Sequence, residues 1–248
     1  MADLSFCSDG DGALLRAAVD AVARGLGEKC RAILLVGPAV PPARHATARP
    51  RQLLVVVSDL PVPALTNLAH QTRDSITAGL RLRLLTAGEL LRSADVFTLE
   101  LCEAQARHLL LAGEDPLLDL HFTQDNLRLS LEQALRSLGR QLRQTVLAYV
   151  VDGAARRGAR PVLSDAIDRM AVIASHALAL SGQPGASAEV DLVRQLGELA
   201  SVDPQPTLDW VGAIRDDGPL DDPVAALADL LLWVEAATRL VDRMGAGD

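Results

Sequence analysis

The sequence has 248 residues, of which 49% are hydrophobic and 23% are charged, and its formal net charge is −8. A chain of this length and composition can bury a sizeable core and can hold two domains, which is what we expect. Aromatic residues make up only 2%, and the acidic balance argues against a concentrated cationic face, so we expect no binding to nucleic acid.

The cysteines and the most apolar stretch bear on the cellular compartment. Cys7, Cys30 and Cys102 are odd in number and have no CxxC spacing, so we expect neither a disulfide framework nor a zinc site. The start, MADLSFCSDGDG, lacks the basic and apolar regions of a signal peptide. The apolar run 224–241 contains charged side chains, which argues against a membrane span. We therefore expect a cytoplasmic protein.

The first half of the chain alternates between helix and strand patterns. Apolar spacing predicts a first helix that is N-capped by Asp11 and stopped by Gly25 and Gly27. Continuous apolar runs predict two buried strands, and leucines that alternate with arginines predict a third, half-buried one. The expected order is helix 12–27, strand 31–37, strand 52–59, helix 63–79, strand 80–86, helix 87–97 and helix 99–113, the last ending at Gly113.

The second half shows helical spacing alone. Apolar residues recur at helical intervals over 126–158, and Gly- and Pro-rich breaks then separate four shorter segments. These segments predict helices at 162–180, 188–199, 207–215 and 223–244. We expect a first domain at 1–120 with a small sheet and a second, all-helical domain at 121–248.

Several short blocks between the two halves occur in a familiar order. They are Asp95-Val96-Phe97, Glu100, His108, the loop Gly113-Glu114-Asp115-Pro116-Leu117, and Leu127-Arg128 at the start of a long helix. With the strands before them, they make residues 10–150 resemble the nucleotidyltransferase-like superfamily, in its minimal type with a C-terminal helical domain. The resemblance implies an α+β fold, with a small mixed β-sheet followed by an all-α helical bundle.

Enzymes of that superfamily use a Gly-Ser turn after the first strand to hold nucleotide phosphates. A D-x-D pair where the second strand begins and a carboxylate on a later strand hold two divalent metals, which need hard oxygen ligands. Here the turn is Gly37-Pro38, the D-x-D positions are Pro50 and Gln52, and the later strand carries Arg81 and Arg83. We therefore expect no catalytic residue, no metal site and no cofactor.

Arginines replace the carboxylates around this turn. Guanidinium groups bind phosphate without a metal, so the altered cleft is a candidate anion site. Its candidate residues are Gly37, Arg49, Arg51, Arg81 and Arg83. The predicted function is that of a catalytically inactive nucleotidyltransferase-like protein that binds a protein partner or an anionic small ligand.

Two other functions stay open. An active, metal-dependent nucleotidyltransferase would need displaced carboxylates, and Asp59 is expected at the wrong end of the second strand. A ribonuclease resembling the HEPN family would use Arg169 and His176, which lie seven residues apart on one helical face and could act on a phosphodiester.

Two further patterns have structural readings. The block 113–117 has the composition of a helix stop and turn. Glu100, Glu103 and Arg107 are spaced for ordinary ion pairs on a helix.

The last helix groups Leu230, Leu231 and Trp233, which could leave an apolar patch for self-association as a dimer.

Overall fold

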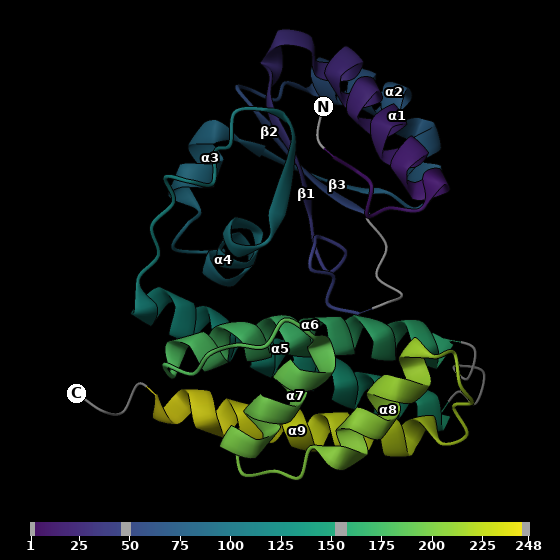
Figure 1. Ribbon diagram of the computed structural model, residues 1–248, viewed down its shortest axis with the longest axis vertical. Coiled ribbons are helices and arrows are strands. Elements are labelled where there is room, and N and C mark those ends of the chain that lie inside the picture. The colour runs from purple at the N-terminus through teal and green to yellow at the C-terminus, as the bar shows by residue number, and fades with distance from the viewer. Residues whose placement is uncertain (1–2, 46–50, 152–157, 245–248) are drawn as a thin grey trace. The chain divides into compact units, whose positions relative to one another are not determined.

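The computed structural model describes residues 3–45, 51–151 and 158–244 (Figure 1). The chain divides into two compact units, Met1–Phe122 and Thr123–Asp248, which we treat in turn.

The first helix, α1 (Asp9–Leu26), begins earlier than the sequence suggested. Its N-cap is Ser8 rather than Asp11, because the Ser8 side chain accepts a hydrogen bond from the Asp11 N–H. Gly27 ends the helix with φ +55°, as expected. Gly25, in contrast, stays inside the helix, where a Cβ atom would lie 2.9 Å from Leu68 Cα. Glycine at this position therefore lets α1 pack closely against the next helix.

The sheet contains β1 (Cys30–Val36), β2 (Gln52–Val57), β3 (Arg81–Thr86) and β4 (His108–Gly113), in the order β3-β2-β1-β4. β1 is antiparallel to both β2 and β4, whereas β2 and β3 are parallel and are joined through α2 (Val62–Thr77). The predicted small mixed sheet is thus confirmed.

The region 87–113 differs from the two helices that the sequence suggested. α3 (Ala87–Arg92) is short, and α4 (Thr98–Ala106) ends before the apolar run, which becomes strand β4. A run of three leucines fits a helix or a strand equally well, and pairing with β1 decides for the strand. Gly113 has φ +84°, and a Cβ atom there would lie 1.9 Å from the Arg31 carbonyl oxygen. The glycine permits this close approach of β4 to β1.

Both faces of the sheet are covered, which explains the continuous apolar runs of β1 and β2. Ile33, Leu35 and Val55 belong to one buried cluster together with side chains of α1 and α2. Leu34 and Val56 belong to a second cluster with side chains of α3 and α4. Figure 1 shows the two helix pairs on opposite sides of the sheet.

Within its described residues, 123–151 and 158–244, the second unit forms helices joined by short connections and contains no strand. Its helices are α5 (Gln124–Val151), α6 (Ala159–Leu180), α7 (Glu189–Leu199), α8 (Gln205–Arg215) and α9 (Pro223–Arg243). α5 packs against α6 and α9, and α6 also packs against α7 and α8. The predicted helical bundle is confirmed.

The apolar patch expected on the last helix is largely core. Leu230 and Trp233 are buried, and Trp233 Nε1 donates a 3.0 Å hydrogen bond to the Val193 carbonyl oxygen. The prediction that these two residues form an apolar surface patch for self-association was therefore wrong, because packing inside the bundle buries them. Among the described residues, no helix combines the length and the apolar character that crossing a membrane requires.

Candidate functional site

The turn after β1 lies beside the first residue of β2. Val36 pairs with Gln52, and a Cβ atom on Gly37 would lie 3.7 Å from Gln52 Oε1. Gly37 itself has φ +102°, a backbone conformation that favours glycine. The Gly37-Pro38 turn thus lies next to Gln52, one of the two positions at which the resemblance implies a D-x-D pair. Pro50, the other position of that pair, lies outside the described residues.

The start of β3 adds two arginines to the same face of the sheet. Gln52 pairs with Arg81, and Leu54 pairs with Arg83. Leu82, between the two arginines, packs into the α1–α2 cluster, so both guanidinium groups leave the strand on the opposite face. We call this set, Gly37, Gln52, Arg81 and Arg83, the turn-side face.

Two candidate residues are not part of the turn-side face. The Arg51 guanidinium lies 3.3 Å from Asp11 on α1 and donates a 3.0 Å hydrogen bond to the Ala78 carbonyl oxygen. Arg51 therefore belongs to the other side of the sheet, next to α1 and α2. Arg49 lies outside the described residues.

The donor set of the turn-side face does not fit a pair of divalent cations. It offers one amide oxygen from Gln52, and the arginine side chains repel metal ions. The nearest carboxylate partner of Arg83 is Glu100 of α4, at 3.9 Å, and both side chains are about half exposed, at 40% and 53%. Within the described residues of each unit taken by itself, no group of three His, Cys, Asp or Glu side chains is close enough to bind one metal ion.

The segment that follows the turn is folded back onto the sheet domain. Val40 N–H donates to the Gly37 carbonyl oxygen, and the Val40 side chain is buried in the α1–α2 cluster. Arg107 at the end of α4 donates a 2.9 Å hydrogen bond to the Val40 carbonyl oxygen and another to that of Pro42. The chain's own side chains therefore hold the segment that leaves the turn.

A buried ion cluster completes this anchoring. Arg44 Nη2 donates to both carboxylate oxygens of Glu103, at 2.7 and 2.8 Å, and both side chains are almost fully buried. Arg107 Nε lies 3.8 Å from the same carboxylate, which confirms the expected ion pair on α4. Burial and the neighbouring Arg44 charge lower the pKa of Arg107. The role of Arg44 could not be predicted from the sequence, because no spacing links it to a partner 59 residues away.

His108 and Asp115 form a second polar contact at the start of β4. His108 Nε2 lies 2.7 Å from Asp115 Oδ2, and Nδ1 lies 2.9 Å from the Ala104 carbonyl oxygen. Asp115 Oδ1 accepts a 2.9 Å hydrogen bond from the Leu117 N–H. The block 113–117 thus ends strand β4 at Gly113 and continues into a turn, so it follows a strand and not the helix that its composition suggested. His108, which the sequence analysis placed on a helix, lies on β4.

The residues of the two alternative functions lie apart from the turn-side face or inside the fold. Asp59 follows β2 and pairs with Lys29 before β1, which is the strand end opposite Gly37, as expected. His176 is only 9% exposed within α6, and Arg169 Nη1 donates a 2.6 Å hydrogen bond to Gln141 Oε1. Neither observation supplies an accessible catalytic group.

Comparisons with known proteins support the fold. No family model matches the sequence, and no curated protein matches it significantly. Among solved structures, the chain is similar to spectinomycin adenyltransferase AAD(9) from Enterococcus faecialis, crystallised with ATP and spectinomycin. The TM-score is 0.57 at 12% identity, and the match covers 93% of this chain and 99% of that one. The chain therefore has the nucleotidyltransferase-like fold, with a small mixed sheet followed by a helical part.

Proposed function

We propose that this chain does not transfer nucleotides and works by binding. The observation behind this proposal is the composition of the turn-side face, where Gln52, Arg81 and Arg83 stand at positions for which the resemblance implies metal ligands. Two-metal phosphoryl transfer requires several hard oxygen donors around closely spaced cations. Two guanidinium groups and one amide cannot provide them.

The anchored segment after the turn supports the same proposal. Pro38 has no N–H to offer a phosphate, and Arg44 is tied to Glu103 inside the fold. A phosphate-binding turn depends on backbone N–H groups that face the ligand. In this chain the turn is followed by residues that are engaged in the domain's own packing.

The proposed ligand is a small anion held by Arg81 and Arg83. The contact between Arg83 and Glu100 is long, at 3.9 Å, and exposed ion pairs of this kind contribute about 0–1 kcal/mol. An incoming phosphate can therefore compete with Glu100 and accept two charge-assisted hydrogen bonds from one guanidinium group. Because the structural neighbour was crystallised with ATP, ATP is the first ligand to test.

The experiment is a calorimetric titration of the full chain with ATP, with and without Mg²⁺. We expect binding that does not depend on Mg²⁺ and weakens about tenfold or more in Arg83→Ala, as loss of one charge-assisted contact predicts. Arg51→Ala is the matched control, because this arginine lies on the other face of the sheet. Mg²⁺-dependent binding, or transfer of labelled nucleotide to an acceptor, would refute the inactive assignment. Absence of any ATP binding would leave a protein partner as the ligand.

A further inference from the structure

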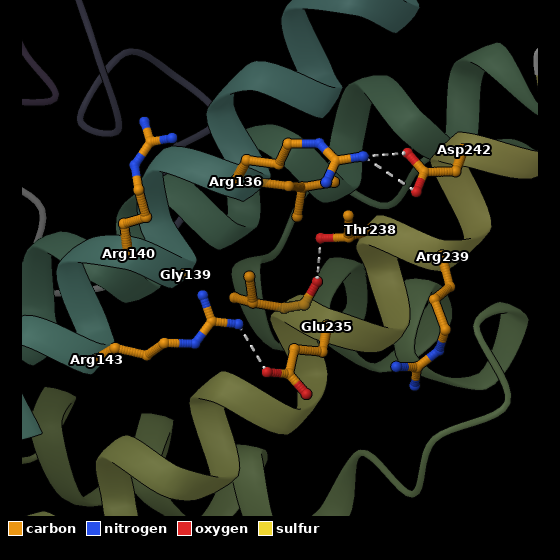
Figure 2. Close-up of a pocket in the computed structure, with 10 residues that line it drawn as sticks. Arg136, Gly139, Arg140, Arg143, Glu235, Thr238, Arg239 and Asp242 are labelled. Atoms are coloured by element: carbon orange, nitrogen blue, oxygen red, sulfur yellow. Dashed lines mark hydrogen bonds and ion pairs between the residues drawn. The ribbon is translucent and has the colours of Figure 1, made fainter.

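The helical unit carries an arginine-lined groove between α5 and α9 (Figure 2). Its volume is about 410 Å³. Its charged lining consists of Arg136, Arg140, Arg143, Arg239, Glu235 and Asp242. Four cationic and two anionic side chains give the groove a local positive excess, although the whole chain has a net charge of −8. We call it the α5–α9 groove.

Two of the four arginines bridge the helices. Arg136 Nη2 lies 3.3 Å from Asp242 of α9 and 2.8 Å from Glu132 of its own helix, and Arg143 Nη2 lies 2.9 Å from Glu235. The residue numbers of the paired side chains rise along α5 and fall along α9, so the two helices are antiparallel. Figure 2 shows these contacts at the two ends of the groove.

Among the described residues, the other two arginines have no carboxylate partner. Arg140 on α5 and Arg239 on α9 are both exposed, and within the described part of the chain neither makes a hydrogen bond or an ion pair. Figure 2 shows them on opposite sides of the groove, with their guanidinium groups directed away from each other. Their separation favours a ligand with several anionic groups over a single compact anion.

The bridging pairs do not block such a ligand. The side chains of Arg136 and Asp242 are 52% and 41% exposed, and those of Arg143 and Glu235 are 54% and 39% exposed. Exposed pairs are weak, whereas a phosphate group can accept two charge-assisted hydrogen bonds from one guanidinium. Gly139 lines the groove without a side chain, and α9 lies close to it, since a Cβ atom there would lie 3.6 Å from Val234 Cγ1. Ligand phosphates can thus replace the carboxylates of α9 at small cost.

We propose that the α5–α9 groove binds a small molecule that carries several phosphate groups. From Arg136 to Arg143 the helix rises by about 10 Å, which matches a short chain of phosphates rather than one. The volume falls within the range of about 300–1,000 Å³ that is usual for small-molecule sites. A long nucleic acid backbone would need a more extended cationic track than this groove provides. The site is separate from the turn-side face and does not depend on the function proposed for it.

The test is a calorimetric titration of the full chain with inorganic tripolyphosphate. We expect binding that weakens at least tenfold in the double variant Arg140→Glu/Arg239→Glu and falls steeply with added salt. The neutral double variant Arg140→Gln/Arg239→Gln should also weaken it, which guards against new ion pairs made by the introduced glutamates. The matched control is Arg24→Glu/Arg73→Glu, which makes the same charge change at two exposed arginines of α1 and α2.

Further titrations distinguish binding in the α5–α9 groove from binding at the turn-side face. The same titrations are repeated in the Arg83→Ala background, which removes the anion contact proposed for the turn-side face, and the groove variants should weaken tripolyphosphate binding by the same factor there. Titration with ATP under the same conditions distinguishes a phosphate chain alone from a nucleotide as the preferred form. Circular dichroism verifies that each variant is folded. The proposal is overturned if the parent chain does not bind tripolyphosphate, or if both groove variants bind it as tightly as the parent.

Discussion

Arg51 and Arg81 are direct neighbours across the start of the β2–β3 pair, yet their side chains lie on opposite faces of the sheet. The Arg81 N–H donates a 2.7 Å hydrogen bond to the Arg51 carbonyl oxygen. The Arg51 guanidinium pairs with Asp11 of α1, whereas Arg81 leaves β3 on the same side as Arg83. The arginines that the sequence grouped as one anion site are therefore divided between two environments, and only the turn-side pair enters the proposed function.

The buried Glu103 carboxylate should be critical for the stability of the sheet domain. We expect Glu103→Gln to lower the free energy of unfolding by about 3–5 kcal/mol, because it leaves two buried guanidinium groups without an anionic partner. Urea denaturation followed by circular dichroism measures this loss. Glu100→Gln is the control, since Glu100 is about half exposed and its pair with Arg83 is long. Its effect should stay below about 1 kcal/mol, and equal losses in the two variants would contradict this role of Glu103.

Gly113 should not tolerate a side chain. Gly113→Ala places a Cβ atom 1.9 Å from the Arg31 carbonyl oxygen in addition to the unfavourable positive φ. Gly79→Ala provides the comparison, because Gly79 has φ +92° but open space around its Cβ position. At Gly79 the unfavourable positive φ alone should lower the free energy of unfolding by about 1–2 kcal/mol. Denaturation midpoints should show a clearly larger loss at Gly113, and similar losses would mean that β4 can shift away from β1.

The helical unit contains its own buried ion cluster. Glu189 is 1% exposed by its side chain and accepts two hydrogen bonds from Arg215, which also contacts Asp168. We expect Glu189→Gln to destabilise this unit by several kcal/mol, within the range of about 3–5 for a broken buried pair.

The control for this second cluster is Asp191→Asn. Asp191 pairs with Arg194 three residues later on the same helix, and both side chains are nearly half exposed. Its loss should lower stability by less than about 0.5 kcal/mol. Thermal unfolding of the two variants provides the measurement, and a large effect at Asp191 with none at Glu189 would reverse the interpretation.

The Cys102 thiol should be unreactive at neutral pH. Burial raises its pKa to about 11, so at pH 8 its thiolate fraction is about two orders of magnitude below that of an ordinary cysteine. Alkylation by iodoacetamide, followed by peptide mass spectrometry, should show very slow labelling that accelerates only as the pH approaches 11. Labelling in urea serves as the control and should be fast. Rapid labelling of the folded chain at pH 8 would contradict the burial of this thiol.

The same pKa shift has a consequence for stability. The pKa of Cys102 is higher in the folded state than in the unfolded state. Its contribution to the free energy of unfolding is therefore fully present below the unfolded-state pKa of about 8.5 and is lost as the pH rises towards 11. Cys102→Ser should therefore reduce the fall in stability over this alkaline window. An unchanged pH dependence in the variant would show that other groups cause the fall.

The sequence by itself determined the local elements whose pattern is long or strongly apolar. Strands β1 and β2 followed from runs of leucine, isoleucine and valine, and the helices of the second unit followed from spacing that repeats over several turns. The absence of carboxylates beside the first turn was also visible in the sequence, because it depends on residue identity alone. These properties are local, so the order of residues is enough to read them.

Only the tertiary structure decided where side chains from distant segments meet. The run 109–111 became a strand because β1 offers it hydrogen-bond partners, and Trp233 became core because α7 covers it. Arg44 and Glu103 found each other across 59 residues. Strand register and helix packing set the face on which each side chain lies, and this is a property of the assembled fold. Residue identity therefore showed that the first turn and the strands beside it carry no carboxylate, whereas only packing showed which arginines share a surface.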